Sequence, residues 1–101
     1  MTKTYSVVTY RAITDPQRFN RYTTLAGPAM EAAGARFIAG GLPARTFEGT
    51  NDQRVVILEF ENSEAAQNAY HSDAYQAALK VLGNGSIRDY RTVLACSVCS
   101  V

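Results

Sequence analysis

The sequence predicts a small α+β domain of βαββαβ order, the ferredoxin-like arrangement, with a four-stranded antiparallel sheet and helices on one face. Three observations predict it. β-branched and aromatic residues alternate near both ends of the chain, amphipathic stretches follow the first and third strand-like runs, and turn-forming residues separate these segments. Because 101 residues is the size of one domain, residues 1–101 are predicted to be a single domain.

The first strand and helix are predicted at the beginning of the chain. Apolar, β-branched and aromatic side chains alternate over residues 5–13, which is typical of a strand. Asp15 then offers a capping oxygen and Pro16 a helical φ, so the first helix is predicted to begin there. Its apolar residues recur every three or four positions, which predicts one buried face. Pro28 predicts a kink or break in this helix, and Gly34 predicts a left-handed cap at its end.

Two strands are predicted in the middle of the chain. Residues 36–39 form a short strand, which the glycine pair at 40–41 is expected to interrupt with a bulge or turn. Residues 44–48 are expected to resume the pairing, before a hairpin loop at 49–52. The run 54–60 is the richest in apolar residues and is therefore predicted to be a central strand.

The second helical region is predicted in two pieces. A cap at Asn62 or Ser63 starts a short helix, and a new cap at residues 72–73 starts a second piece with apolar residues at i, i+3, i+4 and i+7. The turn at 83–85 ends that piece. Alternating residues then predict the last strand over 88–98.

Both faces of the predicted sheet carry apolar residues. The third predicted strand alone places Val56, Leu58 and Phe60 on one side and Val55 and Ile57 on the other. Helices cover only one face, and a bare apolar sheet face would be unusual on a soluble monomer. We therefore expect a homodimer in which two sheets pack face to face.

Composition limits the classes of function. Hydrophobic residues make up 47% and charged residues 19% of the chain, a balance typical of a packed domain. The formal net charge is only +1, so the basic surface that nucleic-acid binding requires is absent. The N-terminal residues lead into a strand without a signal-peptide segment, and no stretch approaches the roughly 18 apolar residues of a membrane span. We therefore expect a cytoplasmic protein with no nucleic-acid or membrane partner.

Cys96 and Cys99 are the two cysteines, and their spacing suggests a redox or metal role. They fall in or just after the predicted last strand, where residues three apart point to opposite faces. A metal site would also need two further ligands. The favoured interpretation is a pair of inert thiols, with a functional role as the alternative.

Short motifs along almost the whole chain carry a family resemblance. They are Thr14-Asp15-Pro16, Tyr22, Pro28, Gly34-Ala35-Arg36-Phe37, Gly40-Gly41, Glu48-Gly49, Val55-Val56-Ile57-Leu58-Glu59-Phe60, Ala65-Ala66 and Tyr70-His71-Ser72-Asp73-Ala74-Tyr75-Gln76. Together they resemble the small bacterial domain of unknown function numbered thirteen-thirty, in the dimeric α+β barrel superfamily. The resemblance implies a homodimer built from facing sheets and a pocket between the helices and sheet of each protomer.

Function stays open on this resemblance, because relatives that share the barrel include cofactor-independent oxygenases, haem-degrading oxygenases, chlorite dismutases and lactone isomerases. The chain also departs from the family pattern at Ala39 and Leu82, where arginines are common. An anion-binding role would therefore fall to Arg36, Arg88 or Arg91 nearby.

Several polar residues are candidates for the site. His71 is the only histidine, so acid–base catalysis by an imidazole would use it; the alternative is a partly exposed residue at a helix end. Tyr22 and Tyr75 lie on the apolar stripes of the helices and would line the pocket or simply pack in the core.

Glu59 lies among apolar residues, an environment that would suit a raised pKa and proton transfer; the favoured interpretation is an ion pair with Arg36, Arg88 or Arg91 across the sheet or the dimer. The catalytic candidates are therefore His71 and Glu59, and the other binding candidates beside the tyrosines are Arg36 and Arg88.

No cofactor is expected. The sequence contains no Ser-His-Asp order, no HExxH pair and no phosphate-binding glycine loop, which disfavours metal and nucleotide cofactors. Tryptophan, on which several oxygenases of the superfamily rely, is also absent. The leading hypothesis is a homodimer that binds a small aromatic or carbonyl-bearing molecule and acts on it by cofactor-free proton transfer or oxygenation. The alternatives are a non-catalytic metabolite-binding or accessory module, and a protein whose dimer interface is its whole function.

Overall fold

The computed structural model describes residues 2–99, so the first residue and the last two of the predicted domain lie outside the described residues. Its elements are β1 (Thr4–Ile13), α1 (Pro16–Ala32), β2 (Arg36–Gly41), β3 (Val55–Phe60), α2 (Ser63–Tyr70), α3 (Asp73–Leu82) and β4 (Ser86–Leu94). This order confirms the predicted βαββαβ arrangement, with the second helical region in two pieces as expected.

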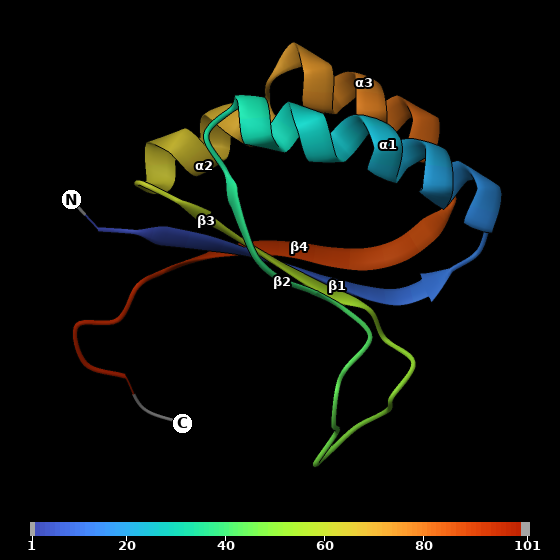
Figure 1. Cartoon of the computed structure of the whole chain (residues 1–101), viewed down its shortest axis with the longest axis horizontal. Helices are drawn as coiled ribbons and strands as arrows, with labels where there is room; N and C mark the ends of the chain where they lie inside the picture. The colour runs from blue at the N-terminus through green and yellow to red at the C-terminus, as the bar shows by residue number, and fades with distance from the viewer. Residues whose placement is uncertain (1, 100–101) are drawn as a thin grey trace.

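The four strands form one antiparallel sheet in the order β2-β3-β1-β4, so β3 is central as predicted. All three helices lie on one face of the sheet (Figure 1). Two layers with this connectivity are the ferredoxin-like α+β fold that the sequence predicts.

The two faces of the sheet differ in burial. On β1 the even-numbered residues Ser6, Val8 and Tyr10 are buried beneath the helices. The odd-numbered residues Val7 and Thr9 are half-buried and point to the opposite face, which no helix of residues 2–99 covers (Figure 1). The loop between β2 and β3 and the tail after β4 extend on that open side.

α1 begins and ends as predicted but is not broken. The Asp15 side chain accepts a hydrogen bond from the Arg18 backbone N–H at 3.2 Å, and Gly34 follows the helix with a φ of 96°. Of the kink or break predicted at Pro28, the break is wrong, because α1 continues to Ala32. Gly27 has no Cβ to clash with the proline ring. The two residues after Pro28, Ala29 and Met30, are buried in the core, and this burial holds the helical turn around Pro28 in place.

The predicted pairing of residues 44–48 is also wrong, since residues 42–54 contain no strand. β2 is an edge strand, and its bulge lies between Phe37 and Ala39 rather than at the glycine pair. Gly40 and Gly41 still pair with β3, and the strand ends at Gly41, where φ is 118°. Positive φ there turns the chain away from the ladder.

The last strand begins and ends earlier than the predicted 88–98. β4 starts at Ser86, which pairs with Ile13, and it ends at Leu94, which pairs with Thr4 at the start of β1. Beyond that point the Ala95 N–H donates to the carbonyl of Lys3, the residue before β1, at 2.9 Å. The strand therefore ends where its partner ends.

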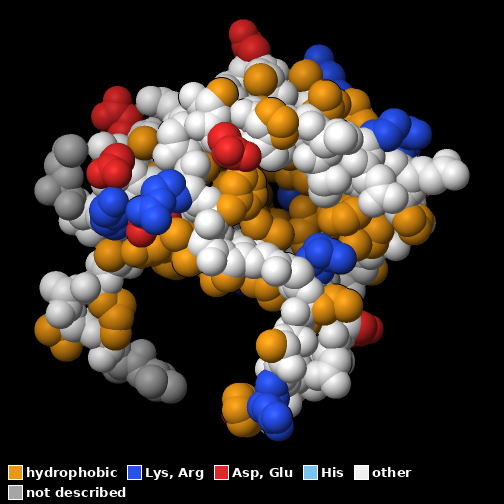
Figure 2. Space-filling view, in the orientation of Figure 1, with side chains coloured by type: hydrophobic (Ala, Val, Ile, Leu, Met, Phe, Trp, Pro, Cys, Tyr) orange, Lys and Arg blue, Asp and Glu red, His pale blue; other side chains and the backbone are white. Residues whose placement is uncertain are grey.

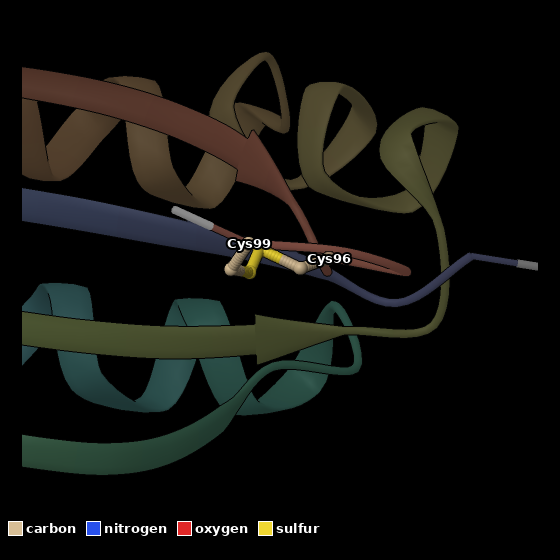
Figure 3. Close-up of a disulfide and its surroundings, with 2 residues drawn as sticks. All are labelled: Cys96 and Cys99. Carbon is tan, nitrogen blue, oxygen red and sulfur yellow. A yellow bond between two sulfur atoms is a disulfide. The ribbon is translucent and has the colours of Figure 1, made fainter. Parts of the chain in front are cut away.

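Cys96 and Cys99 are disulfide-bonded to each other in the tail after β4 (Figure 3). The prediction of two inert thiols is therefore wrong. It assumed strand geometry, in which residues three apart point to opposite faces, whereas the tail has left the sheet. The two Cα atoms lie 5.4 Å apart, a separation that a disulfide spans.

Candidate functional site

A cavity of about 370 Å³ lies between the helices and the sheet. This is the size of a small-molecule site. Figure 2 shows the molecule hollowed between the helix layer and the sheet, with hydrophobic side chains around the hollow and basic side chains in and beside it. The lining residues are Val8, Tyr10, Phe19, Asn20, Tyr22, Thr23, Ala26, Gly27, Met30, Phe37, Arg54, Val56, Leu58, Tyr75, Arg88 and Tyr90.

Four elements contribute the polar part of this wall. Tyr10 lies on the helix-facing side of β1, and Arg88 is its register partner on β4. Tyr22 is buried on the inner stripe of α1, and Tyr75 is buried in the first turn of α3. The start of α3 is fixed by Ser72, whose side chain accepts a hydrogen bond from the Tyr75 backbone N–H at 3.3 Å.

Arg88 joins these side chains into one hydrogen-bonded cluster. Its Nη1 donates to the hydroxyls of Tyr10 at 3.1 Å and Tyr22 at 3.0 Å, and its Nη2 donates to the Tyr75 hydroxyl at 3.1 Å. The hydroxyls of Tyr22 and Tyr75 are 2.7 Å apart and share a hydrogen bond. We call Arg88, Tyr10, Tyr22 and Tyr75 the arginine–tyrosine cluster.

The tyrosines of this cluster are neutral at physiological pH. Burial raises the pKa of Tyr10 to about 12 and also raises the pKa values of Tyr22 and Tyr75 above their ordinary value of 10.0. Burial disfavours the charge of Arg88, but the tyrosine oxygens outweigh this and raise the Arg88 pKa above its ordinary value. The cluster is therefore a cation surrounded by neutral hydroxyls. It can donate hydrogen bonds to a ligand, but it does not accept protons.

A second arginine lines the same cavity. The Arg54 guanidinium carbon lies 5.7 Å from the centre of the Phe19 ring, a cation–π distance. The Arg54 Nε is buried and has no hydrogen-bond partner among residues 2–99. The Phe19 ring in turn meets the Tyr10 ring edge-on at 5.2 Å, so Phe19 and Tyr10 connect Arg54 to the arginine–tyrosine cluster.

Three of the predicted site residues, Tyr22, Tyr75 and Arg88, come together in this cavity. Sequence reasoning missed Tyr10 and Arg54. Tyr10 could have been found, because its even-numbered position on the first strand places it on the apolar side. Nothing in the sequence marks Arg54, which directly precedes β3.

Glu59 and Arg36 lie on the open face of the sheet and do not line the cavity. The Glu59 carboxylate accepts hydrogen bonds from the Tyr5 hydroxyl at 3.1 Å and from Arg36 Nη1 at 3.2 Å, and Lys3 Nζ is 3.7 Å away. The ion-pair alternative for Glu59 is thus present, with Arg36 and Lys3 as its partners.

His71 caps the end of α2 and lies outside the main cavity. It lines a smaller hollow of about 230 Å³ together with Gln67 and Thr92, and its ring meets the Tyr70 ring edge-on at 5.3 Å. Tyr90 lines both spaces, so this residue separates His71 from the arginine–tyrosine cluster.

Residues 2–99 contain neither a cluster of metal-binding side chains nor a helix that could span a membrane. In this part of the chain no three His, Cys, Asp or Glu side chains gather where they could hold a metal ion. None of its helices has the length and apolar character needed to cross a membrane.

Solved structures are similar to this chain over most of its length. RPA0582, a protein of unknown function from Rhodopseudomonas palustris, has a TM-score of 0.76 at 14% identity, over 96% of this chain and 85% of its own. SnoaB, a cofactor-independent oxygenase from Streptomyces nogalater, has a TM-score of 0.70 at 12% identity, over 97% of both chains. A dimeric ferredoxin-like protein of unknown function from Thermobifida fusca has a TM-score of 0.63 at 12% identity, over 93% and 92%. At these identities the likeness shows the fold alone.

The sequence itself points to one family. It matches none of the curated proteins with which it was compared. The model of the family described as "Domain of unknown function (DUF1330)" matches residues 3–96, nearly the whole chain. The chain therefore belongs to the DUF1330 family.

Proposed function

We propose that the protein is a homodimer that binds a small aromatic or carbonyl-bearing molecule in the cavity between the helices and sheet of each protomer. The observation that carries this proposal is the arginine–tyrosine cluster, a group of convergent hydrogen-bond donors in the wall of an otherwise apolar cavity. Apolar walls with a few oriented polar groups are the usual form of a small-molecule site.

The cavity suits a flat molecule that carries an oxygen atom. Phe19, Tyr90 and Met30 offer apolar surface for a ring. A guanidinium has five N–H groups, and Arg88 donates three hydrogen bonds within residues 2–99. Its other N–H groups therefore remain available to a carbonyl oxygen of the ligand.

A cofactor-free oxygenase or isomerase is the enzymatic form of this proposal. Donors aimed at a carbonyl oxygen stabilise the negative charge that develops when a neighbouring C–H loses its proton. The likeness to SnoaB, a cofactor-independent oxygenase, supports this form. A non-catalytic binding module is the second candidate, since the lining residues include no carboxylate and no histidine to take the proton.

The open face of the sheet supports the homodimer. Val7, Val55 and Ile57 are half-buried there, and no helix of residues 2–99 covers them. Covering these side chains with a second sheet removes apolar surface from water. The likeness to a dimeric ferredoxin-like protein supports this assembly.

A matched pair of variants tests the cavity. Thr23 and Thr24 are both exposed on α1, but only Thr23 lines the cavity. We expect aromatic acids, amides and quinones that raise the Tm of the wild type to raise it equally in Thr24→Trp and to lose their effect in Thr23→Trp, because the indole fills the cavity mouth. The proposal would be contradicted if no compound raised the Tm of the wild type, or if the compounds raised the Tm of Thr23→Trp and Thr24→Trp equally.

Turnover then separates the two forms of the function. A bound ligand is incubated in air and its products are followed by mass spectrometry; binding without product favours the binding module. His71 and Glu59 remain proposed catalytic residues, although neither lines the cavity. Normal turnover in both His71→Ala and Glu59→Gln would remove them from the mechanism.

A further inference from the structure

We infer that the natural ligand is an aromatic or similarly planar acid. Arg88 binds its anionic oxygen, and Arg54 is a second cation that binds the same ligand. This inference rests on the proposed function, since it specifies the chemistry of the molecule in the same cavity. It is carried by two arginines that share one apolar wall without any acidic partner.

Arg88 lines the cavity without an acidic partner among residues 2–99. Its guanidinium is half-buried and meets three neutral hydroxyls, while no carboxylate of residues 2–99 lies within ion-pair distance. Hydroxyl groups satisfy hydrogen bonds but do not neutralise a charge. Because an uncompensated charge in an apolar setting is costly, Arg88 attracts a negative group that enters the cavity.

Arg54 repeats this pattern independently. It is half-buried, its guanidinium lies over the Phe19 ring, and its buried Nε lacks a partner among residues 2–99. No carboxylate in that part of the chain forms an ion pair with it. A buried donor without an acceptor is destabilising, and a ligand oxygen would supply the acceptor.

The other six arginines are all exposed to water; Arg21 and Arg45 have no ion pair within residues 2–99, and the other four do. Four exposed arginines each have an acidic partner within 4.0 Å, namely Arg11 with Asp89, Arg18 with Asp15, Arg36 with Glu59 and Arg91 with Asp89. Ion pairs matter least on the surface, where water screens the charges. The two arginines that would gain most from a counter-ion are thus the two that line the cavity without one.

The cavity wall as a whole favours a ligand that has both a negative charge and a planar ring. Its lining residues include two arginines and no aspartate or glutamate, whereas the chain as a whole is nearly neutral at +1. The rings of Phe19 and Tyr10 lie between the two guanidiniums and offer a surface on which a planar molecule can pack. A carboxylate, phenolate or enolate on such a molecule would match this wall.

Isosteric probes test the inference in the wild-type protein. Benzoate and naphthoate are compared with benzamide and naphthamide by calorimetry at equal ionic strength, because each pair has the same shape and differs in charge. We expect each acid to bind at least tenfold more tightly than its amide. The ratio of the affinity for the acid to the affinity for the amide should fall in Arg54→Met and in Arg88→Met. It should stay unchanged in Arg21→Met, because Arg21 is exposed on α1 and lies outside the cavity.

The outcomes separate this inference from the proposed function. Amides that bind as tightly as acids would overturn the inference and leave the cavity as a neutral carbonyl site. If neither class binds, both proposals fail. Should Arg88→Met fail to fold, the wild-type ratio and Arg54→Met still decide, and an acid preference that survives in Arg54→Met would remove Arg54 from the site.

Discussion

At the residue scale, Arg88 shows how a charge can be held half-buried in an apolar wall without an acid. Its guanidinium carbon lies 5.6, 5.1 and 5.6 Å from the ring centres of Tyr10, Tyr22 and Tyr90. Aromatic faces attract a cation, and three hydroxyls accept hydrogen bonds from its N–H groups. These contacts make burial tolerable while leaving the positive charge available to a ligand.

The hydroxyls of Tyr22 and Tyr75 should be energetically coupled, because they share one hydrogen bond and also accept from Arg88. We expect Tyr22→Phe and Tyr75→Phe each to lower the free energy of unfolding by about 1–3 kcal/mol. The double variant should lose about 0.5–1.5 kcal/mol less than the two losses added together. Urea unfolding of the four proteins measures this, and strict additivity would contradict the shared bond.

Stability should fall in alkaline solution. Burial raises the pKa of Tyr10 to about 12 in the folded protein, against an ordinary value of 10.0 that we take for the unfolded chain. The unfolded chain therefore loses this proton first, so the stabilisation is complete below pH 10 and is lost as the pH rises through 12. Urea unfolding from neutral pH upward measures the loss, and Tyr10→Phe should make it smaller. A stability independent of pH in that range would contradict the burial of these phenols.

The residues of the site were predictable only in part. Tyr22 and Tyr75 follow from helical spacing, which fixes the buried stripe of each helix. The side that Glu59 faces could not be predicted, because β3 is apolar on both sides and alternation alone does not tell which side faces the helices. Arg88 meets Tyr10 only through the register of β1 and β4, which pairs residues 78 positions apart. No local pattern contains that information.

At the scale of elements, α1 carries a proline that the core overrides. Pro28 has no N–H to donate to the preceding turn, yet the helix runs to Ala32 because Ala29 and Met30 are buried. We expect Pro28→Ala to raise the free energy of unfolding by about 1–3 kcal/mol, since it restores a helical donor.

Pro43 provides the matched control for this prediction, because it lies in the loop between β2 and β3 rather than in a helix. There we expect Pro43→Ala to lower stability by about 0.4–1 kcal/mol, since the unfolded chain gains freedom. Thermal unfolding measures whether each substitution raises or lowers the stability. Equal effects of the two substitutions would show that the helical setting of Pro28 has no energetic consequence.

Most elements were predictable because their signals are local. The caps at Asp15, Asn62 and Ser72 all accept the expected backbone hydrogen bonds. The extra strand at 44–48 and the extension of the last strand to residue 98 were wrong for a shared reason. A strand exists only where a neighbour pairs with it, and β1 starts at Thr4 while β3 starts at Val55.

At the scale of the whole molecule, the open face combines an apolar centre with charged ends. Val7 and Ile57 are register partners near its centre. At one end Lys3 and Arg36 flank Glu59, and toward the other end Arg11 pairs with a second acid, Asp89, which also pairs with Arg91, the register partner of Val7 on β4. A face of this kind fits a two-fold interface, in which the same patch of each protomer meets itself.

Ile57→Glu should therefore separate the proposed dimer without unfolding the protomer. Ile57 is half-buried between Val7 and Ala39 on the open face, so a glutamate there stays hydrated in a lone protomer but would be buried in a dimer. Leu25→Glu is the matched control, because Leu25 is 47% exposed on α1, on the opposite side of the sheet. In sedimentation velocity runs at micromolar concentration we expect wild type and Leu25→Glu to migrate as dimers and Ile57→Glu as a monomer with unchanged circular dichroism. A wild-type protein that sediments as a lone protomer would remove the dimer, whereas a dimeric Ile57→Glu protein would move the interface away from the sheet.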